Sequence, residues 1–98
     1  MKIKSIEIIE QNLCLLINTE IDFEQFNNFA DSLCQAIDCT VIERQWGADR
    51  HQWLLDFEGT RLELHYEFYS QACWLTVADV QDLDVLQYLA QLLRPFYE

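Results

Sequence analysis

The sequence is poor in basic residues, and this shortage excludes two classes of partner. Its 98 residues include six lysines and arginines against seventeen aspartates and glutamates, which gives a formal net charge of −11. Nucleic acid binding needs clustered cations that displace the counterions of the phosphates, and six scattered basic residues form no such cluster. The same charge is repelled by anionic membrane surfaces. We therefore expect no nucleic acid and no membrane partner, and we expect basic or apolar proteins, or small molecules, instead.

Glycine, proline and long apolar runs are also scarce. Two glycines and one proline exclude collagen-like and low-complexity chains, and they leave no glycine-rich loop to hold a phosphate. No segment approaches the roughly 18 apolar residues of a membrane span. We expect no signal peptide in the first residues, because Glu7 and Glu10 interrupt the apolar stretch that such a peptide needs. These absences predict a cytoplasmic protein.

The chain also lacks a recognisable metal-binding pattern. Its four cysteines lie at irregular spacings among apolar residues, which predicts reduced thiols in a core: Cys14, Cys34, Cys39 and Cys73. Cys34 and Cys39 flank an expected helix end, but their spacing matches no usual zinc motif. Asp79, Asp82 and Asp84 lack the glycine and the bidentate glutamate of a calcium loop. We expect no metal and no cofactor.

Hydrophobic residues make up 51% of the chain, and aromatic residues 13%. This content excludes a disordered chain. The length allows one hydrophobic core and is too small for two, so we expect residues 1–98 to form a single domain.

Hydrophobic periodicity predicts six strands and two helices. The strands are expected over residues 3–9, 13–17, 40–46, 51–58, 60–66 and 71–77, and the helices over residues 23–38 and 80–96. Asp22 and Gln25 match a capping box before the first helix, and Asp79 is the expected N-cap of the second. The order β-β-α-β-β-β-β-α predicts an α+β fold, a two-layer sandwich whose sheet is mostly antiparallel and has both helices on one face.

A two-residue turn at Glu58-Gly59 predicts the register of the central hairpin. It pairs Asp56 with Arg61 and continues outward to pair Gln52 with His65. This register places the apolar side chains of both strands on one face and the polar ones on the other, whereas a slip of one residue would mix them.

The strand expected over residues 40–46 cannot be sorted in this way. Under regular alternation Arg44 and Trp46 fall on the same face as Ile42, so one face carries both a charge and large apolar groups. The pattern assigns this strand neither an inner nor an outer face.

Extending the hairpin register through the next turn pairs Leu64 with Cys73 and points Trp74 outward, beside Glu63 and His65. A large aromatic side chain on a polar face that no helix covers is typical of a contact site. The candidate interaction residues are Leu54, Asp56, Arg61, Glu63, His65 and Trp74. Alternatively, long neighbouring side chains shield Trp74, and Asp56 forms an ordinary cross-strand ion pair with Arg61.

These observations favour a non-enzymatic protein-interaction module that binds a protein partner or forms a homo-oligomer. One alternative is an inhibitor or immunity protein for a basic toxin, since charge complementarity accelerates such association. The other is a small-ligand-binding protein or small enzyme with Arg61, Glu63 and His65 lining its site. Acid–base catalysis needs a cleft that excludes water, and an open sheet face does not provide one, so we expect no enzymatic activity.

The central hairpin and the strand after it carry one resemblance. The stretch Trp-Leu-Leu-Asp-Phe-Glu-Gly-Thr-Arg-Leu-Glu-Leu-His-Tyr-Glu over residues 53–67, followed by Cys73-Trp74-Leu75, resembles a family of short bacterial proteins classed as a domain of unknown function and found mainly in gamma-proteobacteria. The resemblance implies a bacterial, cytosolic protein, and it transfers no catalytic residue.

Overall fold

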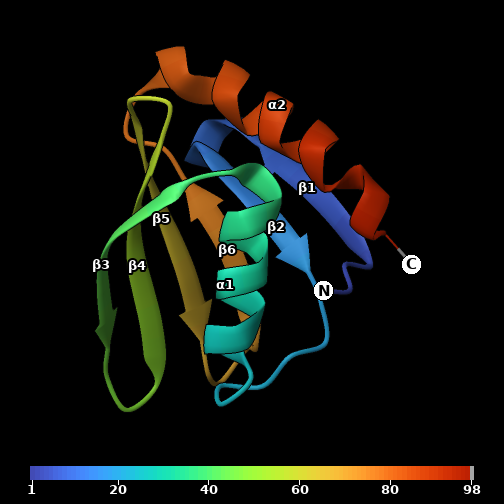
Figure 1. Cartoon of the computed structure of the whole chain (residues 1–98), viewed down its shortest axis with the longest axis vertical. Coiled ribbons are helices and arrows are strands. Elements are labelled where there is room, and N and C mark those ends of the chain that lie inside the picture. Colours follow the sequence, from blue (N-terminus) through green and yellow to red (C-terminus); the bar gives the residue numbers. More distant parts are fainter. Residues whose placement is uncertain (98) are drawn as a thin grey trace.

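The computed structural model describes residues 1–97 and shows a two-layer α+β fold (Figure 1). In chain order its strands and helices are β1 (Ser5–Ile9), β2 (Cys14–Asn18), α1 (Phe26–Ile37), β3 (Thr40–Trp46), β4 (Arg50–Phe57), β5 (Thr60–Glu67), β6 (Ala72–Thr76) and α2 (Leu83–Leu93). The strands form one antiparallel sheet in the order β1-β2-β6-β5-β4-β3. The predicted fold class and element order are confirmed.

Helix α1 begins after the predicted capping box. The Asp22 carboxylate accepts the Gln25 N–H at 2.8 Å, and the Gln25 side chain accepts the Asp22 N–H at 3.0 Å. The box forms a turn, so the regular helix starts at Phe26 and not at residue 23 as expected. The helix ends where Asp38 adopts a left-handed conformation (φ 54°), and the Cys39 N–H then donates to the Cys34 carbonyl at 3.0 Å.

Helix α2 follows a short 3-10 turn, Val80–Asp82, whose N-cap is Asp79 as expected. The Asp79 carboxylate accepts the Gln81 N–H at 3.3 Å. The buried side chains of α2 are Leu86, Leu89 and Leu93, and the helix packs on β1 and β2. Both helices join one hydrophobic core on the same face of the sheet, and they leave the other face uncovered (Figure 1).

The register predicted for the β4–β5 hairpin is confirmed. Asp56 lies opposite Arg61, and Gln52 lies opposite His65. The turn residues Glu58 and Gly59 both have positive φ, at 50° and 88°, as a two-residue hairpin turn of this hand requires. The inward side chains of the hairpin are buried except for Thr60 beside the turn, whereas the outward ones are partly or fully exposed.

The predicted pairing of β5 with β6 is wrong by two residues. Leu64 lies opposite Leu75, and not opposite Cys73. The turn is longer than expected, because residues 68–71 all lie outside the strands and Gln71 takes a left-handed conformation (φ 54°). A shift of two residues preserves the faces, so Trp74 still points outward, but its direct partner is His65.

A bulge in β3 explains why its alternation could not be read. The register with β4 shifts between Val41 and Glu43, so Ile42 is the extra residue. Beyond the bulge, Arg44 lies opposite Trp53 and Trp46 lies opposite His51. Both partners are buried on the helix side, and Arg44 and Trp46 therefore face that side as well.

Candidate functional site

The six predicted interaction residues share one surface, which we call the outer face: the side of the sheet that neither helix covers. The registers place two cross-strand rows at its centre. One row is Leu16, Trp74, His65, Gln52 and Gln45, and the other is Cys14, Thr76, Glu63, Leu54 and Glu43. Asp56 and Arg61 form the next pair toward the Glu58-Gly59 turn. Their role in binding stays a prediction.

Trp74 and His65 stack at the centre of the outer face. Their ring centroids are 5.0 Å apart and the planes differ by 11°. His65 Nε2 also lies 3.3 Å from the Thr76 hydroxyl and 3.7 Å from the Glu63 carboxylate. Burial lowers the pKa of His65, although Glu63 opposes this shift. The stack leaves Trp74 half-buried, so this indole is neither freely exposed nor enclosed in the core.

The outer face carries two hollows. The larger, of about 290 Å³, lies over β1, β2 and the start of β6, and its outward-facing lining residues are Ser5, Glu7, Leu16, Asn18 and Ala72. The Gln52 side chain donates to Glu63 at 3.0 Å. A hollow of about 100 Å³ lies beside this pair, lined by Glu43, Gln45, Gln52, Leu54 and Glu63. Sites for drug-sized ligands have volumes of about 300–1,000 Å³, so this smaller hollow cannot hold such a ligand, and the larger one lies at the lower limit of the range.

The structure does not assemble the trio of Arg61, Glu63 and His65. Glu63 lies beside His65, but Arg61 is exposed near the hairpin turn, opposite Asp56. Within residues 1–97, Arg61 forms no ion pair with Asp56, so the predicted cross-strand pair is also not observed.

A second surface, which the sequence did not reveal, lies on the helix side between α1 and β3. This groove has a volume of about 590 Å³. Its lining residues are Phe23, Glu24, Asn27, Asp31, Arg44, Trp46, His51 and Trp53. The Arg44 guanidinium lies 4.5 Å above the Trp53 ring and 3.6 Å from the Asp31 carboxylate. Trp46 is 73% exposed.

His51 forms the floor of this groove. Its ring stacks on Phe23 and Phe26, with centroid distances of 4.2 and 4.6 Å. Its Nε2 lies 3.1 Å from the Phe23 carbonyl. Burial lowers the pKa of His51, and the bond to the Phe23 carbonyl opposes that shift.

We expect the fold to lose stability as the pH falls from 7 to 5. Both His51 and His65 have a lower pKa in the folded chain than in the unfolded chain, so the unfolded chain binds more protons in this interval. The loss begins as the pH passes the ordinary histidine value of about 6.5 and is complete below the folded pKa values. Urea unfolding at several pH values measures it. In the double variant His51→Gln/His65→Gln the free energy of unfolding should depend less on pH between 7 and 5. An unchanged pH dependence would show that these two histidines do not cause the loss.

The Cys34 and Cys39 thiols are in contact at the C-terminal end of α1. A hydrogen bond from Cys34 lowers the pKa of Cys39, while burial and this bond raise the pKa of Cys34. Burial also raises the pKa of Cys14 and Cys73. In a helix that ends with a left-handed residue, the side chain one residue beyond it commonly contacts a side chain in the last turn, and here these two residues are Cys39 and Cys34. Among residues 1–97, no cluster of three or more metal-ligating side chains is found.

These environments predict that Cys39 is the most reactive thiol of the folded protein. It is half-buried and its pKa is lowered, whereas the other three cysteines are buried. With Ellman's reagent we expect one fast thiol in buffer and four in denaturant. The Cys39→Ser variant should lose the fast phase and Cys73→Ser should keep it. A fast phase that survives in Cys39→Ser would show that another cysteine is the most reactive thiol.

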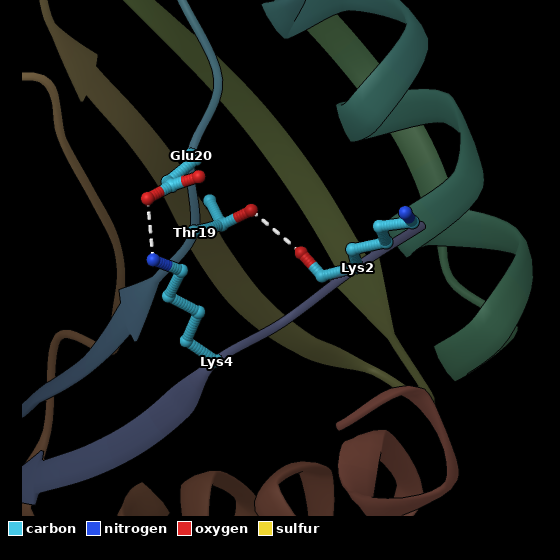
Figure 2. Close-up of polar contacts among 4 residues, drawn as sticks. All are labelled: Lys2, Lys4, Thr19 and Glu20. Atoms are coloured by element: carbon cyan, nitrogen blue, oxygen red, sulfur yellow. Dashed lines mark hydrogen bonds and ion pairs between the residues drawn. The ribbon is translucent and has the colours of Figure 1, made fainter. Parts of the chain in front are cut away.

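Both lysines of the chain lie at another hollow, of about 380 Å³, near the N-terminus. Figure 2 shows the Lys4 ammonium paired with the Glu20 carboxylate, and the Thr19 hydroxyl donating to the Lys2 carbonyl at 2.6 Å. The bond from Lys4 lowers the pKa of Glu20. These contacts fasten the N-terminal segment to the chain that follows β2, and Glu20 neutralises Lys4, so we assign this hollow a structural role.

Comparisons with known proteins identify a family but no described relative. In the part of the chain that the structure describes, no helix has both the length and the apolar content needed to cross a bilayer. The chain matches no curated protein and no solved structure. One family model, described as "Protein of unknown function (DUF3630)", matches residues 3–94, a span that contains every strand and both α-helices. A domain of unknown function is thus confirmed, whereas a bacterial origin stays a prediction. The chain belongs to the DUF3630 family.

Proposed function

We propose that this chain is a non-enzymatic module of the bacterial cytoplasm that binds a basic partner protein through its outer face. The observation that carries the proposal is the pair of apolar side chains, Leu54 and Trp74, on a sheet face that no helix covers. Both are half-buried by their neighbours and partly open to solvent. Aromatic side chains at the centre of a contact surface often contribute most of its binding energy.

The setting of these side chains supports a protein partner. An antiparallel sheet often has one solvated face, so exposure alone would not suggest binding. Here Leu16 lies beside Trp74, Glu63 and His65 lie between Trp74 and Leu54, and further carboxylates flank this centre, from Glu7, Glu43, Asp56 and Glu67. Aromatic and aliphatic side chains bordered by polar groups are typical of a protein interface. The two hollows of this face, of about 290 and 100 Å³, lie below the usual volume of a drug-sized site, which favours contact with a protein surface over a small ligand.

The charge of the chain favours a basic partner over a second copy. Two molecules that each carry a formal charge of −11 repel one another, whereas a basic surface is attracted and associates faster. An inhibitor or immunity protein of a basic toxin is one partnership of this kind.

The Trp74→Ala variant tests the proposal, with Tyr88→Ala as its control. Tyr88 is 49% exposed but lies on α2, away from the outer face. Immobilised wild-type protein should retain a basic protein from cell extract, release it at high salt, and bind it at least about tenfold more tightly than Trp74→Ala does. Tyr88→Ala should behave as wild type. Equal retention by Trp74→Ala would overturn the proposal.

A further inference from the structure

The groove between α1 and β3 presents both an open strand edge and a charged aromatic wall. Strand β3 is the last strand of the sheet and, among residues 1–97, pairs with β4 alone (Figure 1). In an antiparallel ladder alternate residues direct their backbone N–H and C=O groups away from the partner strand. After the bulge at Ile42, residues 43–46 form a regular stretch of this edge strand, and two of them, Arg44 and Trp46, line the groove.

The groove already holds one cation of the chain's own. The Arg44 guanidinium lies over the Trp53 ring and beside the Asp31 carboxylate, which shows that these walls accept a guanidinium group. Two further features have no such partner among residues 1–97: the exposed ring of Trp46 and the carboxylate of Glu24. They offer a second cation the same combination of an aromatic face and a negative charge.

We propose that this groove binds an extended basic segment of a partner protein, which adds to β3 as a seventh strand and places an arginine or lysine side chain on Trp46. In such an added strand, alternate side chains point toward the groove. A basic residue fits beside Trp46 and Glu24. The neighbouring position beside Arg44 rejects a like charge and accepts an apolar or acidic residue.

The charge of the groove favours a basic segment of a partner protein over a second copy of the chain. Glu24 and Asp31 give the lining two carboxylates against one guanidinium, within a chain of net charge −11. A second copy of the chain would bring another eleven negative charges to the same edge. The site lies on the helix side of the sheet, opposite the outer face, so the inference does not rest on the proposed function.

The probe is a fluorescent eight-residue peptide of alternating threonine and valine that contains two arginines. Its twin carries glutamates in place of the arginines. We expect the arginine peptide to bind at least tenfold more tightly than its twin, with an affinity that falls as salt is added. Hydrogen exchange should slow at the amides of residues 43–46. The Trp46→Ala variant should bind at least tenfold more weakly, and Trp46→Phe within about threefold of wild type, because a phenyl ring keeps the aromatic face.

Two further variants locate the site. Arg44→Gln should bind the arginine peptide severalfold more tightly, because it removes the competing cation from Asp31 and Trp53. Trp74→Ala, which changes the outer face alone, should bind as wild type does. Equal binding of both peptides, protection of strands other than β3, loss of binding in Trp74→Ala, or self-association of the wild-type chain through β3 would each overturn the inference. Loss of binding in Trp74→Ala would place the peptide on the outer face and would not count against the proposed function, which the retention assay with Trp74→Ala and Tyr88→Ala tests independently.

Discussion

Replacing Trp53 with alanine is expected to lower the free energy of unfolding by about 3–5 kcal/mol. Trp53 is 1% exposed and meets Phe26 edge-on, with a centroid distance of 5.6 Å. The Arg44 guanidinium covers its ring from the β3 side. Truncation leaves a cavity where β4, α1 and β3 meet. Since domains of this kind are stable by only about 5–15 kcal/mol, urea denaturation should show a large fall in the midpoint.

Trp46→Ala is the matched control, because it removes the same side chain two strand positions from Arg44, at an exposed site. Trp46 is 73% exposed, so we expect a change within about 0.5 kcal/mol. Equal destabilisation by the two substitutions would show that Trp46 packs as part of the core. The control also establishes that Trp46→Ala remains folded in the peptide-binding experiment.

The parts of the fold that follow from local chemistry could be predicted from the sequence. The Glu58-Gly59 turn and the strict alternation on both sides of it determine the β4–β5 register without reference to the rest of the chain. The Asp22–Gln25 capping box likewise acts over four residues, and its reciprocal hydrogen bonds are both present. Five of the six predicted residues of the outer face follow from that register, and Trp74 follows from the pairing of β6, whose displacement by two residues preserved the face.

The two features that could not be predicted both involve an added residue or an uncommon backbone conformation. Nothing in the sequence around Gln71 signals a left-handed conformation, so the length of the β5–β6 turn could not be predicted. The predicted pairing of β5 with β6 was therefore displaced by two residues. The bulge at Ile42 reverses the alternation of β3 and depends on how that strand meets β4. A residue count alone does not distinguish a bulged strand from a regular one.

The groove was missed for the same reason. Its walls come from α1, β3 and β4, and they meet only because the bulge turns Arg44 and Trp46 toward the helix side. In the sequence the only hint was that these two residues, together with Ile42, spoiled an otherwise regular pattern. An irregular edge strand that carries an exposed tryptophan is therefore the signal that could have indicated this site.

Replacing Leu89 with alanine is expected to cost about 2–5 kcal/mol, and the effect should concentrate on one half of the sheet. Leu89 is fully buried on α2, which packs on β1 and β2, whereas Phe26 of α1 packs on Trp53 of β4. Because β1 is an edge strand, it depends on α2 to cover its inner side chains. In the Leu89→Ala variant the amides of β1 should therefore exchange faster under mild denaturant than those of β4 and β5. Gln87→Ala, an exposed position on the same helix, should change the stability by less than about 0.5 kcal/mol. Uniform acceleration of exchange over all six strands would instead mean that the two halves unfold as one unit, and that α2 stabilises the outer face and the β3 groove equally.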